Sequence, residues 1–143
     1  MPAVKAAEVS VLSGRVVHFE VPFDDVDRAR AFYQGAFGWN IMPMPEMSYT
    51  MVATGPTGDQ GPSEPGYIGG GLTERTELLQ GPVITVDVED IDAALATIEQ
   101  LGGKTVRSRQ EIGGGMGFTA YFTDPEGNLT GLYQMDQGGS STG

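Results

Sequence analysis

Hydrophobic and polar residues alternate along residues 16–23, and this period of two predicts a strand with two different faces. One face carries Val17, Phe19, Val21 and Phe23, and the other carries Val16, His18 and Glu20. Asp24 or Asp25 then suits a helix cap, and Gly38 suits the end of the helix. Between them, apolar residues at helical spacing predict an amphipathic helix whose aromatic residues form core against the sheet: Val26, Ala29, Phe32, Tyr33 and Phe37.

The same order of strand, acidic cap and helix returns over residues 83–103. Asp90 repeats Asp25 at an offset of 65 positions (90 − 25), and the same offset pairs Gly38 with Gly103. The apolar stripe of the second predicted helix is Ile91, Ala94, Leu95, Ile98 and Leu101. An internal duplication explains this agreement better than chance. At this offset His18 falls opposite Val83, so the two halves differ at the first strand.

Each half then continues with three more predicted strands. In the first half these are residues 39–44, 48–54 and, weakly because of its glycines, 67–72, with an exposed loop over 55–66. In the second half they are residues 104–109, 118–123 and 129–134. We therefore expect one α+β domain made of two βαβββ modules, with these boundaries: a flexible N-terminus over 1–13, the first module over 14–72, a linker over 73–81, the second module over 82–134, and a flexible tail over 135–143.

Composition narrows the possible partners and sites. The 143 residues include no cysteine, which excludes disulfides, thiolate metal sites and cysteine nucleophiles. The formal net charge is −11, so we expect neither nucleic acid nor an anionic membrane surface as a partner, because no basic patch is available to hold phosphate. With no 18-residue apolar run and no signal-peptide pattern at the start, we expect a cytoplasmic protein.

Several short motifs give the chain a family resemblance. They are the segment from His18 to Val21, Ala31-Phe-Tyr, Phe37-Gly-Trp39, and Asp124-Pro-Glu-Gly-Asn128 before the strand that ends at Gln134. With the repeated module, these motifs make the chain resemble the vicinal oxygen chelate superfamily, which includes glyoxalase I, bleomycin- and fosfomycin-resistance proteins and extradiol dioxygenases. The resemblance covers roughly residues 14–134 and implies a cupped mixed sheet with helices outside. It also implies a homodimer.

Catalytic members of that superfamily hold a divalent metal in the cup with His, Gln and Glu ligands from the first and last strands of each module. His18 matches a first-strand ligand position, but Val83 stands at the equivalent place in the second module. Gly131 precedes Leu132 where a Glu is common, and Gly70 or Gly71 stands at the corresponding place in the first module. Since one imidazole does not make a specific metal site, we expect neither a metal nor another cofactor.

His18 and Glu20 are the strongest polar candidates, because residues two apart on a strand share a face. His18 could be a former ligand, a general base or a polar anchor for a ligand, with Glu20 orienting its ring. The plainer alternative is a histidine satisfied by hydrogen bonds in a partly buried strand. Further candidates to line a ligand pocket are strand residues with aromatic, thioether or hydroxyl side chains, which could equally be core: Tyr49, Met51, Thr85, Tyr121 and Tyr133.

These observations favour a protein that binds a small, largely apolar molecule in a metal-free cup. The alternative is an enzyme of the same superfamily, a lyase, isomerase or dioxygenase that uses either a metal or His18 and Glu20. A third possibility is an interaction domain whose cup is filled by its own side chains.

Overall fold

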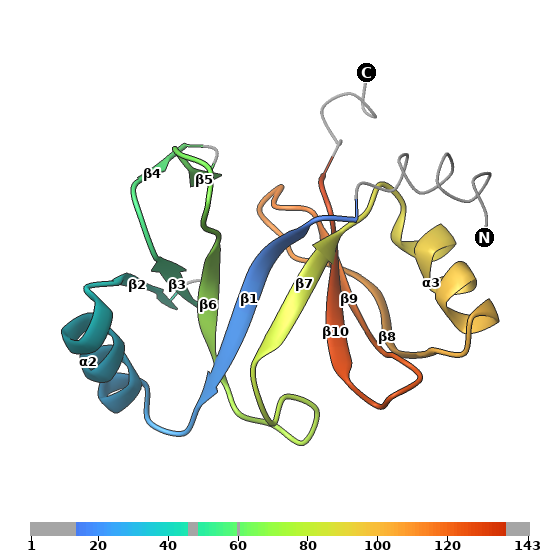
Figure 1. The fold of residues 1–143 in the computed structure, drawn as a ribbon, viewed down its shortest axis with the longest axis horizontal. Helices are drawn as coiled ribbons and strands as arrows, with labels where there is room; N and C mark the ends of the chain where they lie inside the picture. Colours follow the sequence, from blue (N-terminus) through green and yellow to red (C-terminus); the bar gives the residue numbers. More distant parts are fainter. Residues whose placement is uncertain (1–13, 46–48, 60, 137–143) are drawn as a thin grey trace. The chain divides into compact units, whose positions relative to one another are not determined.

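The computed structural model describes residues 14–45, 49–59 and 61–136 (Figure 1). The predicted flexible N-terminus over residues 1–13 and most of the predicted tail lie outside these residues. The chain divides into two compact units. Val17–Ile84 forms the N-terminal unit, and the described parts of Met1–Val16 and Thr85–Gly143 form the C-terminal unit.

The N-terminal unit is a mixed sheet with one helix. Its strands run in the order β2-β3-β6-β1, with β6 parallel to β1 and antiparallel to β3. The weakly predicted strand is therefore real and lies inside this order, between β3 and β1. The bounds of these elements are β1 Val16–Phe23, α2 Val26–Phe37, β2 Asn40–Met44, β3 Tyr49–Ala53 and β6 Gly69–Glu74.

The predicted loop over residues 55–66 contains a small hairpin that the sequence pattern did not reveal. Its strands, β4 (Thr57–Gly58) and β5 (Gly61–Pro62), are each two residues long. Strands this short leave no room for an alternating pattern. The hydroxyl of Tyr67 donates to the carbonyl of Pro56 and ties the base of the hairpin.

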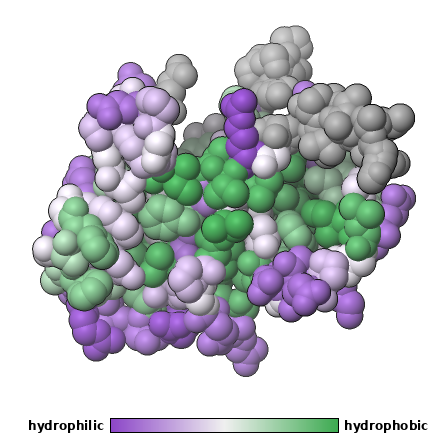
Figure 2. Space-filling view, viewed as in Figure 1, coloured by the Kyte–Doolittle hydropathy of each residue, from purple (hydrophilic) through white to green (hydrophobic). Residues whose placement is uncertain are grey.

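Helix α2 begins and ends where the sequence predicts. The Asp25 carboxylate accepts a hydrogen bond from the Arg28 N–H (3.0 Å), and Gly38 ends the helix in the left-handed region at φ 72°. The prediction that Phe32 and Phe37 form core is wrong, because they are 60% and 62% exposed. Figure 2 shows hydrophobic surface where α2 lies, at the left of the view.

The turn geometry of α2 accounts for part of this difference. Ala29 and Tyr33 lie about one turn apart and pack toward the core of the N-terminal unit, whereas Phe32 is rotated about 100° from Tyr33 around the helix axis. Tyr33 stacks on Trp39 with ring centroids 4.9 Å apart, and Phe37 contacts the same indole at 5.5 Å.

The core of the N-terminal unit shows which face of β1 is turned toward α2. Its buried residues are Ile41, Val52 and Leu72, and the partly buried residues packed against them are Phe19, Val21, Phe23, Ala29, Tyr33 and Trp39. Since Phe19, Val21 and Phe23 lie on the α2 side, alternation places His18 and Glu20 on the opposite face, as the sequence predicts.

The C-terminal unit has the same order of elements. Its strands run β7-β10-β9-β8, with β10 parallel to β7 and antiparallel to β9. Strand β8 is longer than predicted and carries two register shifts, which an alternating pattern cannot announce. The bounds are β7 Val83–Asp87, α3 Ile91–Gln100, β8 Lys104–Glu111, β9 Phe118–Thr123 and β10 Leu129–Gln134.

Two side chains satisfy the first N–H groups of α3. Asp90 accepts from the Ala93 N–H (3.2 Å), and the Gln134 side-chain oxygen at the end of β10 accepts from the Ile91 N–H (2.8 Å). Ile91 and Leu95 are buried in the core of this unit, but Leu101, which the apolar stripe included, is 74% exposed. Gly102 (φ 102°) turns the chain immediately after Leu101, so the stripe ends before it.

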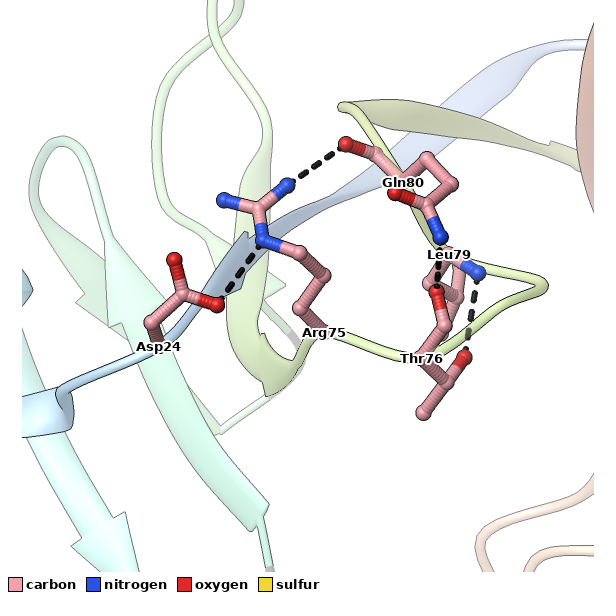
Figure 3. Close-up of polar contacts among 5 residues, drawn as sticks. All are labelled: Asp24, Arg75, Thr76, Leu79 and Gln80. Atoms are coloured by element: carbon pink, nitrogen blue, oxygen red, sulfur yellow. Dashed lines mark hydrogen bonds and ion pairs between the residues drawn. The ribbon is translucent and has the colours of Figure 1, made fainter.

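The segment predicted as a linker is held by its own hydrogen bonds (Figure 3). Arg75 pairs with Asp24 (3.0 Å) and donates to the Gln80 carbonyl (2.6 Å), while the Thr76 hydroxyl accepts from the Leu79 N–H (3.0 Å). These contacts hold the chain in place where it leaves β6. Within the part of the chain that the structure describes, no helix is long and apolar enough to cross a membrane.

The contrast between Ile91 and Leu101 gives a stability prediction. We expect Ile91→Ala to lower the free energy of unfolding by about 2–5 kcal/mol, because it leaves a cavity around a fully buried side chain. Leu101→Ala, the matched control from the same sequence pattern, should change it by less than about 0.5 kcal/mol. Urea denaturation measures both, and equal losses would contradict the burial assigned to these positions.

Candidate functional site

A hydrogen bond between His18 and Tyr49 crosses the sheet of the N-terminal unit. The two residues lie on β1 and β3, with β6 between these strands. The His18 Nε2 atom is 2.7 Å from the Tyr49 hydroxyl oxygen, and the two rings are inclined by only 23°. Both side chains are partly buried. A polar pair thus lies on the face of the sheet opposite α2.

Glycine at position 71 makes this pair possible. A Cβ on Gly71 would lie 2.8 Å from the Tyr49 Cε1 atom and closer still to the hydroxyl oxygen, so any side chain there would displace the phenol ring. Gly71 is in register with Glu20 on β1 and with Met51 on β3. Tyr49 therefore reaches His18 by passing over β6 at Gly71, where the strand has no side chain.

Burial keeps both members of the pair neutral. It lowers the pKa of the His18 imidazole and raises the pKa of the Tyr49 phenol, and the negative charge of Glu20 raises the phenol pKa further. At pH 7 His18 thus has an unprotonated ring nitrogen, and Tyr49 keeps its proton. The charge of Glu20 acts on the Tyr49 member of this pair.

The four candidate residues of the first module meet on one face. Glu20 and Met51 flank Gly71 in register, and His18 and Tyr49 join above the same strand. The structure thus brings together the polar and apolar groups that the sequence proposed for a ligand pocket. Their role in binding stays a prediction.

An open groove of about 280 Å³ lies elsewhere in the N-terminal unit. Most of its lining comes from the α2 side of the sheet and the strand ends, and it shares only Tyr49 with the predicted set. The lining residues are Phe23, Val26, Pro43, Met44, Pro45, Tyr49, Thr50, Leu72, Thr73 and Glu74. We place the candidate site at the His18 face, because the groove lacks a comparable partly buried polar pair.

In the C-terminal unit, Gly131 takes the position that Gly71 has in the other unit. It is in register with Thr85 and with Tyr121, and both side chains close over it: a Cβ on Gly131 would lie 2.9 Å from the Thr85 hydroxyl oxygen and 3.5 Å from the Tyr121 ring. The Arg107 guanidinium lies over the Tyr121 ring, 5.7 Å from its centroid. Thr85 and Tyr121 are therefore brought together, and Arg107 joins them.

Tyr133 has a structural partner. Its hydroxyl donates to the Met116 carbonyl at 2.8 Å and so anchors the glycine-rich loop between β8 and β9. Burial, followed by the charges of Asp87 and Asp136, raises the pKa of this phenol. The predicted pocket role of Tyr133 therefore competes with this anchoring contact.

The donor groups do not fit the metal that the family resemblance implies. His18 uses Nε2 in the bond to Tyr49, the raised pKa of Tyr49 disfavours a phenolate ligand, and Gly71 supplies no donor. Among the residues that the structure describes, no three His, Cys, Asp or Glu side chains are grouped closely enough to hold a metal ion.

Sequence reasoning missed three contributors to these sites: Gly71, Gly131 and Arg107. The sequence pattern marked Gly71 and Gly131 only as positions that lack a metal ligand, whereas in the structure Gly71 makes room for the Tyr49 side chain. Arg107 stands in a strand of mostly polar, exposed residues. No signal within that strand distinguished it from its neighbours.

Comparison with known sequences gives relatives along most of the chain. Residues 15–55 match the family described as bleomycin resistance protein-like N-terminal. A glyoxylase-like domain-containing protein of Didymella fabae is 29% identical over 124 residues, covering 82% of this chain and 91% of that protein. A protein of Vibrio parahaemolyticus named "Probable lactoylglutathione lyase" is 28% identical over 134 residues, covering 87% and 94% respectively.

Solved structures share the fold at low identity. Methylmalonyl-CoA epimerase from Mycobacterium tuberculosis superposes with a TM-score of 0.59 at 15% identity, covering 92% of this chain and 93% of the epimerase. A methylmalonyl-CoA epimerase in complex with methylmalonyl-CoA and NH4+ gives 0.58 at 19% identity, covering 87% and 96%. The family match over residues 15–55 and the two relatives indicate the vicinal oxygen chelate superfamily, the glyoxalase and bleomycin-resistance group, and the solved structures share this fold.

Proposed function

We propose that this protein binds a small, largely apolar molecule at the His18 face of the N-terminal unit, without a bound metal. Met51 and the ring of Tyr49 supply apolar surface, and His18 and Glu20 supply polar groups that orient the ligand. Thr85, Tyr121 and Tyr133 stay predicted ligand contacts from the sequence.

The observation that carries this proposal is the neutral His18–Tyr49 pair over Gly71. A catalytic metal of the family type needs several converging donors, and this face offers one imidazole whose Nε2 is already bonded to a phenol. A neutral polar pair beside a thioether on a partly buried face suits a ligand with an apolar body and few polar atoms.

An acid-base enzyme is the second candidate, and the similarity to a protein named as a lyase favours it. A neutral imidazole beside a protonated phenol and the Glu20 carboxylate is a set that can move a proton. Lactoylglutathione and CoA esters are anionic, however. The arginines described in the N-terminal unit lie on α2 or pair with Asp24, away from the His18 face. The binding role therefore ranks first.

We further propose an internal duplication, a homodimer and a cytoplasmic location. The register of Gly71 with Glu20 and Met51 corresponds to that of Gly131 with Thr85 and Tyr121, which supports the duplication. The homodimer rests on the family resemblance. The cytoplasmic location rests on the sequence alone.

Ligand binding can be tested by thermal shift with a panel of neutral aromatic ketones, phenols and esters. A compound that binds the native state should raise the melting temperature progressively with its concentration, and the added stability should be about 2.7 kcal/mol at a concentration 100 times Kd. Met51→Gln, which places an amide on the His18 face, should weaken that compound about tenfold or more.

The exposed Met135 gives the matched control, because Met135→Gln makes the same chemical change at an exposed position of the C-terminal unit. Val26→Thr tests the α2-side groove in the same way. If no compound shifts the melting temperature, or if Val26→Thr weakens binding while Met51→Gln does not, the proposed site is wrong.

The neutral state of His18 gives a pH prediction. Burial lowers the folded-state pKa of His18 below its unfolded value of about 6.5, so acidification favours the unfolded chain, which binds the proton more readily. The contribution of His18 is therefore fully present above pH ~6.5 and is lost as pH falls toward the lowered native pKa. Relative to His18→Gln, the wild type should lose unfolding free energy between pH 7.5 and 5 in urea titrations. A relative gain on acidification would show a charged native imidazole.

A further inference from the structure

The Nε2 atom of His18 faces the Tyr49 hydroxyl in this structure. A metal-binding histidine gives the lone pair of one ring nitrogen to the ion, whereas here Nε2 lies 2.7 Å from the Tyr49 hydroxyl oxygen. We infer that the Tyr49 O–H takes the place of a metal at His18: it donates to Nε2, fixes the ring as the Nδ1–H tautomer, and does so because Gly71 leaves room for the phenol.

The geometry assigns each residue a separate part in this arrangement. Tyr49 reaches His18 across β6, and its ring occupies the space that a side chain at position 71 would need. That position lies on the strand where the family pattern expects a second donor. The phenol thus fills the place of the missing ligand and also contacts the remaining one. Gly71 is a positioning residue, because it acts on His18 only through Tyr49.

The direction of the hydrogen bond follows from where the phenol hydrogen can go. Burial raises the pKa of the phenol and lowers that of the imidazole, so both groups are neutral. Among the described residues, the bond to His18 is the one hydrogen bond of the Tyr49 hydroxyl, so a proton on Nε2 would leave the phenol hydrogen without an acceptor there. The O–H donates and Nε2 accepts. A neutral imidazole then carries its single ring proton on Nδ1.

The Nδ1–H group is the part of His18 left for a ligand. The bond to Tyr49 is the hydrogen bond that His18 makes among the described residues, and it uses Nε2. Every fully buried side-chain nitrogen or oxygen in the described part of the chain has a partner, so Nδ1 is not sealed inside the protein. A molecule with an acceptor oxygen, such as a carbonyl or ether, on an apolar body complements this donor.

This inference deepens the proposed function and rests on it for the ligand class, but the tautomer itself can be measured without a ligand. His18 is the only histidine of the chain, so its ring nitrogens give one unambiguous set of signals in a two-bond 1H–15N spectrum of uniformly labelled protein. At pH 7.5 the wild type should show Nδ1 protonated and Nε2 unprotonated. A protonated Nε2 would overturn the inference.

Three variants test the parts assigned to Tyr49 and Gly71. Tyr49→Phe keeps the ring over Gly71 and removes only the hydroxyl, so both tautomers should become populated. Gly71→Ala displaces the phenol and should shift the His18 signals in the same direction. Gly35→Ala, at a helical glycine with open space around it, should leave those signals unchanged.

A purely structural glycine would give a different result. Gly71→Ala would then lower the melting temperature while the Nδ1–H tautomer persisted, and Tyr49→Phe would have no effect on it; either result overturns the assignment. If Gly71→Ala does not fold, Tyr49→Phe still decides the direction of the bond. A confirmed tautomer with an empty ligand screen would remove the proposed function and leave this inference standing.

Discussion

The 2.7 Å contact between His18 and Tyr49 is the interaction on which the account of this protein depends. It joins the two strands on either side of β6, and it exists because Gly71 has no side chain to block the phenol. The same contact keeps two polar groups satisfied in a partly buried place, where an unpaired imidazole or phenol would be costly. As a result, the His18 imidazole is neutral and held in one orientation.

The two units show how one strand arrangement supports different chemistry. Gly71 and Gly131 occupy corresponding places, each in register with two neighbouring strands. Tyr49 closes over the first glycine, and Thr85 with Tyr121 closes over the second. The shared strand arrangement therefore does not fix the local chemistry, because different side chains surround the two glycines.

Much of the fold can be read from periodicity and caps, because these features are local. The alternation along β1, the Asp25 and Asp90 caps and the stop at Gly38 all depend on residues within a few positions of one another. Exposure is harder to predict: Phe32 and Leu101 fit an apolar helical stripe, yet one is rotated away from the core and the other lies just past the helix end. The sequence pattern shows how apolar residues are spaced along a helix, but it does not show where the surface that packs against the helix ends.

The candidate site was only partly predictable. His18 stood out as the one histidine, and Tyr49 was a possible wall residue, but their bond spans 31 positions and a third strand. Its existence depends on the register of β6 with both neighbours, which a glycine-rich stretch does not specify. A glycine on a strand helps to locate a site only once the side chain that packs over it is known.

The most direct measurement is the His18 ring 15N spectrum before and after an equimolar amount of Ni²⁺, Zn²⁺ or Mn²⁺ is added to metal-free protein. We expect unchanged His18 signals and no metal retained after desalting, because Nε2 is bonded to Tyr49 and position 71 offers no donor. Loss or displacement of the signals together with near-stoichiometric metal that disappears in His18→Ala would contradict this expectation.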